Sequence, residues 1–185
     1  LEVVMKENID INLALKNLKK NGIHIIQNFW TKEKCNIAIA ELNNIHKKNW
    51  VVGQGGDLRC RPADKFSKLC IDFLENQCIK NIASAYSVCN VNESVQANIV
   101  TSIPNIEIDS GGGWHVDSIK SEPQFKSIIY LTDTTEQNGP FLFIPNTKKI
   151  IKEVPMYSNN RIEEKYIYDN FKKSIIKVLG SAGTC

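Results

Sequence analysis

The chain has 185 residues, of which 42% are hydrophobic, and its formal net charge at pH 7 is +3. This length and apolar content predict one globular domain, residues 1–185, with a core of its own. The lysines are scattered rather than clustered, so nucleic acid is not expected as a partner. No apolar run is as long as a membrane span, and the N-terminus does not resemble a secretory signal, so we expect a cytoplasmic protein without membrane contact.

The first half of the chain, residues 1–92, is expected to be mostly helical. Apolar residues recur at the helical period over residues 11–20, and Gly22 follows as a typical helix terminator. Thr31 is a typical N-cap for a second helix. A short strand is expected between them, at residues 23–26. The apolar spacing from residue 69 to residue 88 predicts a further helix with a break in it.

The glycine- and proline-rich stretch 51–64 predicts an irregular loop. Such loops often carry function. Arg59 and Arg61 lie in this stretch, and two guanidinium groups suit a substrate carboxylate or phosphate. We therefore consider both as substrate-binding residues, with solvated surface arginines as the alternative.

From residue 93 onward, short β-rich segments separated by proline and glycine predict a sandwich or barrel. The interval 148–173 is charged and less regular, with a short helix expected near residues 161–169. The expected strands are residues 94–103, 114–118, 125–132, 141–144 and 175–179.

The cysteines show no C-x-x-C pair, and a chain of this length does not need disulfides to fold, so buried free thiols are expected. Cys35, Cys70 and Cys78 fall on predicted apolar helix faces. His24 and His46 lie within or next to predicted elements, and a structural role is expected for each.

Residues 111–117, with the sequence GGGWHVD, carry the clearest chemical signal. His115 and Asp117 are two positions apart, so a strand would present both side chains on one face. An imidazole and a carboxylate, joined by a second histidine, form the facial triad that binds Fe(II) and leaves positions open for substrate and oxygen. Either the pattern is a coincidence, or the chain stops before its third ligand.

The motifs around this pair resemble the phytanoyl-CoA dioxygenase family of Fe(II)- and 2-oxoglutarate-dependent oxygenases. In that family a W-H-x-D strand precedes a hydrophobic strand with an acidic turn, an E-N-G-P-like turn, and a strand that closes in P-G-S-H. The opening of the family is similar to residues 21–35. The other matching segments are residues 114–117, 130–133, 136–140 and 144–147.

The chain departs from the family pattern in two places. Asn146, Thr147 and Lys148 follow Pro145 where the family has Gly-Ser-His, a change expected to alter a turn more than the chemistry. Residues 180–185 resemble the turn before the strand that carries the distal histidine and the arginine for the far carboxylate of 2-oxoglutarate. Both residues are absent, so this truncated chain is expected to be inactive by itself.

The resemblance implies a mainly β fold with N-terminal α-helices, namely a double-stranded β-helix, or cupin-like jelly roll. Residues 93–185 would form its core, incomplete at the C-terminus. It implies a dioxygenase that uses Fe(II) and 2-oxoglutarate to hydroxylate an unidentified small molecule, with His115 and Asp117 as metal ligands and catalytic residues. The carboxylate of Asp117 favours hydroxylation over halogenation, because halogenating relatives replace it.

Alternation along the neighbouring strands places polar side chains on one face, where 2-oxoglutarate would supply their partners. These candidate cosubstrate-binding residues are Asn98, Lys126 and Tyr130, and the alternative is that their faces point to solvent. Unpaired strand edges would also favour homo-oligomers. The alternative from another class is a non-catalytic jelly-roll module that binds a partner or has a structural role.

Overall fold

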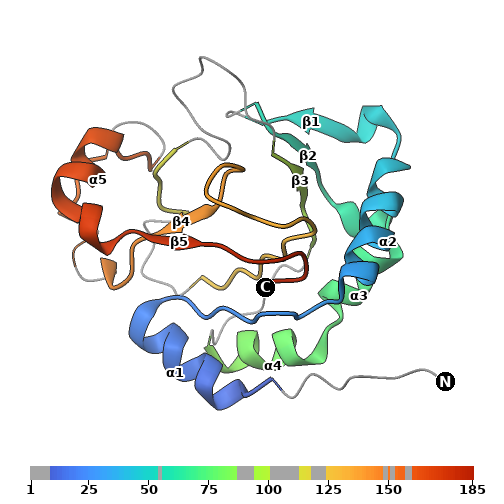
Figure 1. Ribbon diagram of the computed structural model, residues 1–185, viewed down its shortest axis with the longest axis horizontal. Helices are drawn as coiled ribbons and strands as arrows, with labels where there is room; N and C mark the ends of the chain where they lie inside the picture. The colour runs from blue at the N-terminus through green and yellow to red at the C-terminus, as the bar shows by residue number, and fades with distance from the viewer. Residues whose placement is uncertain are drawn as a thin grey trace.

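The computed structural model describes residues 9–53, 56–86, 94–100, 113–117, 124–147, 150, 153–156 and 160–185, and Figure 1 shows the arrangement of its elements. The α-helices are α1 (Ile11–Asn21), α2 (Lys32–Asn43), α3 (Lys68–Leu74), α4 (Gln77–Tyr86) and α5 (Glu164–Phe171). One antiparallel sheet contains β1 (Trp50–Val52), β2 (Leu58–Cys60) and β3 (Ala97–Ile99), and another contains β4 (Phe141–Phe143) and β5 (Ile176–Val178).

The first helix begins and ends where the sequence predicts, and the second begins where the sequence predicts. The Asp10 carboxylate accepts the Leu13 N–H at the start of α1, and Gly22, with φ 81°, ends the helix in the left-handed conformation. Thr31 accepts the Lys34 N–H at 3.2 Å and so begins α2. The expected break between α3 and α4 is also confirmed.

The strand expected at residues 23–26 is not formed as a regular element. Instead, Ile26 exchanges two backbone hydrogen bonds with Cys185, with N···O distances of 2.7 and 2.9 Å. The Thr184 hydroxyl also donates to the Gln27 side chain at 2.9 Å. The segment between α1 and α2 therefore lies beside the C-terminal residues of the chain (Figure 1).

The prediction of an irregular loop at residues 51–64 is wrong for the first part of that range, which contains most of the β1–β2 hairpin. Val51 pairs with Arg59, and β3 adds on the other side of β2, where Asn98 pairs with Arg59. The hairpin forms because alternate residues at its base are apolar and pack in one core cluster with residues of α2 and α3. Figure 1 shows the sheet beside these two helices. This core cluster contains Leu42, Ile45, Cys60, Ala63, Cys70 and Ala97, with Trp50, Val95 and Leu131 against it.

Among the strands expected in the second half, β3, β4 and β5 form within the predicted ranges 94–103, 141–144 and 175–179, whereas residues 125–132 form no regular strand. Tyr130 exchanges backbone hydrogen bonds with Gly183 and Thr184. The helix expected at residues 161–169 begins later, at Glu164. Arg161 is therefore not helical; it forms an antiparallel bridge with His115 instead.

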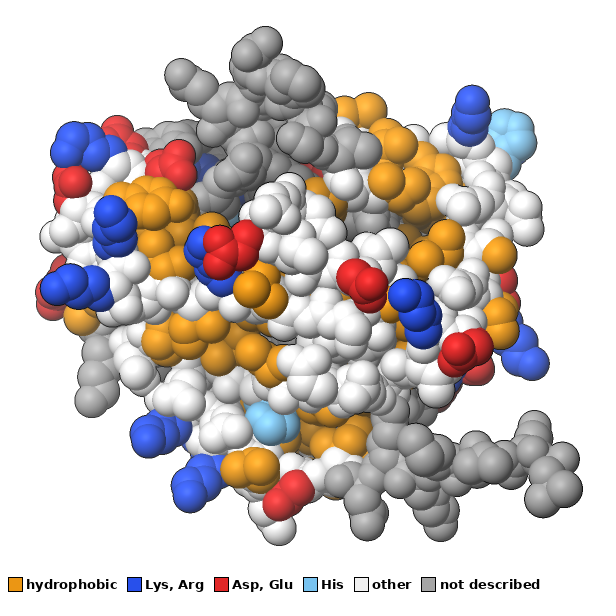
Figure 2. Space-filling model, viewed as in Figure 1, with side chains coloured by type: hydrophobic (Ala, Val, Ile, Leu, Met, Phe, Trp, Pro, Cys, Tyr) orange, Lys and Arg blue, Asp and Glu red, His pale blue; other side chains and the backbone are white. Residues whose placement is uncertain are grey.

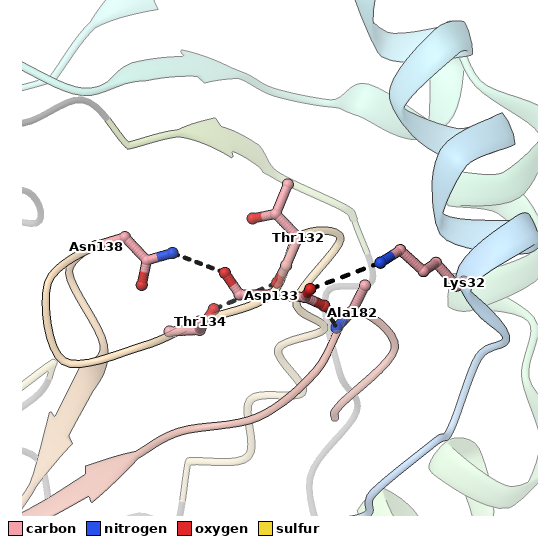
Figure 3. A network of polar contacts seen from close by, with 6 residues as sticks. All are labelled: Lys32, Thr132, Asp133, Thr134, Asn138 and Ala182. Carbon is pink, nitrogen blue, oxygen red and sulfur yellow. Dashed lines mark hydrogen bonds and ion pairs between the residues drawn. The ribbon is translucent and has the colours of Figure 1, made fainter.

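The acidic turn after Tyr130 anchors the C-terminal residues (Figure 3). Asp133 accepts the Ala182 N–H at 2.8 Å and lies 3.6 Å from the Lys32 ammonium group at the start of α2. The Asn138 side chain donates to the Asp133 carbonyl at 2.7 Å. Backbone hydrogen bonds between Thr134 and Gly180 continue this contact. Two of the segments that carry the family resemblance thus hold each other and residues 180–184 in place.

No cysteine within the described residues forms a disulfide, and Cys35, Cys60 and Cys70 are buried. Burial raises the pKa of each of these three thiols, which keeps them protonated and unreactive. Cys78 and Cys185 are partly buried, and Cys89 lies outside the described residues. The expectation of buried free thiols is confirmed for the first three.

Figure 2 shows cationic and anionic side chains interspersed on one face of the molecule, with hydrophobic side chains in patches between them. None of the helices that the structure describes has both the length and the apolar character needed to span a bilayer.

Glu41 of α2 caps the start of α3 and gives a stability prediction. Its carboxylate accepts the Ser67 hydroxyl at 2.5 Å and the Leu69 N–H at 3.0 Å. The Ser67 hydroxyl, and then the Leu69 N–H, lower the pKa of Glu41. Replacing Glu41 by glutamine is expected to cost about 1–2 kcal/mol of unfolding free energy at neutral pH, because a charged acceptor is lost. Urea unfolding measures this cost.

A lowered carboxyl pKa contributes stability above the ordinary value of 4.5 and loses it as pH falls through the folded-state pKa. The difference between wild type and Glu41→Gln should therefore shrink below about pH 4. Glu153→Gln, at an exposed glutamate, is the control and should change stability little. A difference between Glu41→Gln and wild type that stays constant with pH would contradict the capping role.

Candidate functional site

The short segment 113–117 presents His115 and Asp117 on one side and apolar residues on the other. Trp114 and Val116 pack against a core cluster beneath α5, which also contains Ile162. Because side chains alternate along an extended chain, His115 and Asp117 lie on the opposite side from this cluster. Both side chains are partly exposed, 37% for His115 and 43% for Asp117. The expected common face is confirmed by the distance of 3.5 Å between His115 Nε2 and Asp117 Oδ1.

The His115 ring is held in one orientation by the backbone. Its Nδ1 lies 2.8 Å from the Gly113 carbonyl oxygen. A carbonyl only accepts hydrogen bonds, so Nδ1 carries the proton and the neutral ring has its lone pair on Nε2. Metal-binding histidines commonly have this arrangement, in which a backbone carbonyl fixes the tautomer and the other nitrogen binds the ion. The nitrogen beside Asp117 is therefore the one suited to a metal.

Lys126 joins this pair from residues 124–130, which form no regular element. Its Nζ lies 2.6 Å from Asp117 Oδ1. When the ring is protonated, Nε2–H donates to Asp117, and this hydrogen bond, followed by the contacts with Lys126, holds the pKa of Asp117 well below its ordinary range. The carboxylate beside His115 in turn raises the pKa of the imidazole, although burial and the charge of Arg161 act in the opposite direction. Asp117 is ionised at neutral pH and is available as a ligand.

These residues fit two positions of an Fe(II) site. Imidazole nitrogen and carboxylate oxygen are the ligand types of the facial triad. Within the parts of the chain that the structure describes, no third histidine, cysteine, aspartate or glutamate completes the group. The described donor set is one imidazole and one carboxylate, and Lys126 neutralises the carboxylate.

The other predicted cosubstrate residues lie apart from this pair. The Tyr130 hydroxyl donates to the Val178 carbonyl at 3.0 Å and accepts the Phe141 N–H at 3.0 Å, so it connects its segment to β4 and β5. Burial raises the pKa of Tyr130. Asn98 is exposed and accepts a hydrogen bond from the Gln96 side chain at 2.8 Å.

The two predicted substrate-binding arginines differ in their surroundings. Arg59 lies across from Asn98 on the face of the sheet away from α2 and α3, but its guanidinium group is bound to Asp57. The Nε–Oδ2 and NH2–Oδ1 distances are 2.6 and 3.1 Å, and Asp57 is fully buried. Hydrogen bonding to Asp57 raises the pKa of Arg59. Arg61 is exposed at the end of the hairpin.

The structure adds Arg161 to the site, which the sequence did not reveal. A helix predicted from residue 161 would have placed its side chain elsewhere. The adjacent acidic residues Glu163 and Glu164 could have indicated that the helix starts later than residue 161, because negative charge favours the first turn of a helix. The bridge partner of His115 could not be derived from sequence spacing.

Searches against protein-family models, curated proteins and solved structures return no match for this chain.

Proposed function

We propose that this chain is part of an Fe(II)- and 2-oxoglutarate-dependent dioxygenase that hydroxylates a small molecule and has the fold of a double-stranded β-helix. The observation that supports this most directly is the His115–Asp117 pair. Its side chains share one face, and the Gly113 carbonyl leaves His115 Nε2 as the ligand nitrogen beside an ionised carboxylate. The two antiparallel sheets and the N-terminal helices are compatible with such a fold.

His115 and Asp117 would hold the metal in this proposal, and Fe(II) with bound 2-oxoglutarate would supply the oxidising chemistry. The chain's own residues prepare the site. Gly113 orients the imidazole, and Lys126 compensates the Asp117 charge before metal arrives. A cation on Asp117 would repel the Lys126 ammonium group and release it to bind a cosubstrate carboxylate. Asn98 and Tyr130 stay candidates for polar contacts with the cosubstrate, and Arg59 and Arg61 for substrate contacts.

The second candidate is a jelly-roll module without redox chemistry. The 2.6 Å ion pair between Lys126 and Asp117 favours it, because the carboxylate already has a partner in the absence of metal. In that case the His115–Asp117–Lys126 group is a surface ion cluster and has no affinity for metal. Metal binding therefore decides between the two candidates.

The test is the change in melting temperature during a titration with Co(II), an air-stable substitute for Fe(II), on wild type and Asp117→Ala. At a metal concentration ten times the dissociation constant, binding to the native state adds about 1.4 kcal/mol, which corresponds to about 3–6 °C for a domain of this size. We expect this rise in wild type and no rise in Asp117→Ala, because one of two protein ligands is removed.

Asp169→Ala is the matched control, because Asp169 also forms an exposed ion pair with a lysine, Lys165, at 2.5 Å. It should respond to Co(II) as wild type does. If all three proteins respond equally, or wild type does not respond, the dioxygenase proposal is wrong and the binding or structural module is favoured.

We propose a cytoplasmic enzyme that forms homo-oligomers through exposed strand edges. Val51 and Val52 on β1, an outer strand of the sheet as described, support such contacts because they are 61% and 72% exposed.

A further inference from the structure

Lys126 and His115 lie against the same oxygen atom of Asp117. The Lys126 Nζ atom is 2.6 Å from Asp117 Oδ1, and His115 Nε2 is 3.5 Å from that same atom. A carboxylate has two oxygen atoms, so an ammonium group is not restricted to the one beside the imidazole. The ion pair therefore forms at the oxygen atom that lies next to the candidate ligand nitrogen.

The separation of these two ligand atoms is close to the value that a single metal ion requires. Bonds from zinc to imidazole nitrogen and to carboxylate oxygen are about 2.1 Å long. Two such atoms on one ion are about 3.0 Å apart at a right angle and about 3.4 Å apart at the tetrahedral angle. The observed 3.5 Å between His115 Nε2 and Asp117 Oδ1 needs little adjustment. A metal ion in this position would bind the oxygen atom that Lys126 already contacts.

An ammonium group and a metal ion repel each other when both lie on one oxygen atom. With the observed 2.6 Å ion pair and a metal bond of about 2.1 Å, the two cations could be at most about 4.7 Å apart. Like charges at that separation disfavour each other. The side chains of Lys126 and Asp117 are 62% and 43% exposed, so water weakens the effect to that of a surface ion pair.

We propose that Lys126 is a built-in competitor of the metal ion at Asp117, and that metal binds by exchange with its ammonium group. This inference rests on the proposed dioxygenase function and deepens it, because it names what controls the loading of the site with metal. At low metal concentration the ion pair with Lys126 persists. The apparent metal affinity is lower than the intrinsic affinity by the fraction of molecules in which Asp117 is open.

The first test compares Co(II) affinity among lysine variants by calorimetric titration. Lys126→Gln should bind Co(II) about fivefold more tightly than wild type, which corresponds to about 1 kcal/mol. Lys126→Arg keeps the competing cation and should bind no more tightly than wild type. The matched control is Lys177→Gln, which removes the same charge from another exposed ion pair, with Glu136 at 3.1 Å. It should bind Co(II) as wild type does.

A second readout follows the lysine side chain itself. Zn(II) is diamagnetic, so the Cε–H signals of Lys126 can be followed by NMR while the metal is added. They should move to the positions of a solvated lysine, in parallel with the amide signal of Val116. The advantage of Lys126→Gln over wild type in Co(II) affinity should also shrink at high ionic strength, because salt screens exposed charges.

The possible results separate this inference from the proposed function. If wild type and Lys126→Gln bind Co(II) equally, the competition is overturned and the dioxygenase proposal stands. An unchanged Lys126 signal during titration of the Val116 amide has the same meaning. A gain in Lys177→Gln as large as that in Lys126→Gln would reflect net charge alone and would also overturn the competition. If neither wild type nor Lys126→Gln binds Co(II), both proposals are wrong.

Discussion

Replacing Gly183 by alanine is expected to cost about 3–5 kcal/mol of unfolding free energy, measured by urea denaturation. Gly183 has a φ of 93°, and a Cβ atom there would overlap the backbone carbonyl of Trp30. Backbone on both sides restricts any adjustment, because Gly183 donates to the Tyr130 carbonyl and accepts the Trp30 N–H. The added methyl group would separate the C-terminal residues from the core cluster that contains Phe29 and Trp30.

Gly139→Ala is the matched control for this prediction. Gly139 also has a positive φ, 76°, but a Cβ atom there would meet only the Val100 side chain, at an ordinary 3.5 Å. Its cost should be that of the left-handed conformation alone, about 1–2 kcal/mol. Equal losses for the two variants would show that residues 180–185 do not pack against Trp30 as described.

Replacing Asp57 by alanine is the second change with a large expected effect. Asp57 is fully buried, and the side chain of Arg59 is 29% exposed. Removing the carboxylate leaves a mostly buried guanidinium group without its partner, which costs about 3 kcal/mol when a buried pair is broken. Gly53 also depends on this pair, since a Cβ atom there would overlap both side chains. Thermal or urea unfolding measures the loss.

The double variant Asp57→Ala with Arg59→Ala should recover part of that stability, because no unpaired charge remains. Asp169→Ala, which breaks an exposed aspartate–lysine pair, should change stability by less than about 1 kcal/mol. If Asp57→Ala is as mild as Asp169→Ala, Arg59 is not held by Asp57 and its candidacy for substrate binding is strengthened.

Local signals predicted the helices well, and they failed where long-range pairing decides the structure. Asp10, Gly22 and Thr31 mark helix ends through contacts with residues at most four positions away, which a sequence pattern contains. The β1–β2 hairpin was missed because the glycines in residues 53–56 indicated an irregular loop instead of two short strands. Those strands form only because Cys60 and its neighbours are covered by α2 and α3, and this cover is invisible in local sequence.

In the candidate site, too, the local features were predicted and the long-range contacts were not. The common face of His115 and Asp117 follows from a spacing of two and was predicted. Lys126 was predicted as a cosubstrate-binding residue on one face with Tyr130, and its 2.6 Å ion pair with Asp117 was not predicted. Arg161 reaches the site by pairing across a gap of more than forty positions, and no sequence period encodes such a pairing.

The contact between the segment after α1 and the last residues of the chain also has a consequence for folding kinetics. The side chains of Gln27 and Thr184 are joined over 157 positions, and Ala182 completes the cluster around Phe29 and Phe73. Closing so long a loop costs conformational entropy before any contact can offset that cost, so contacts between such distant residues slow folding. During synthesis, α1 to α4 leave the ribosome long before Ala182 does. Until then the Phe29 cluster lacks one side, and in that interval the nascent chain is open to association through exposed apolar surface.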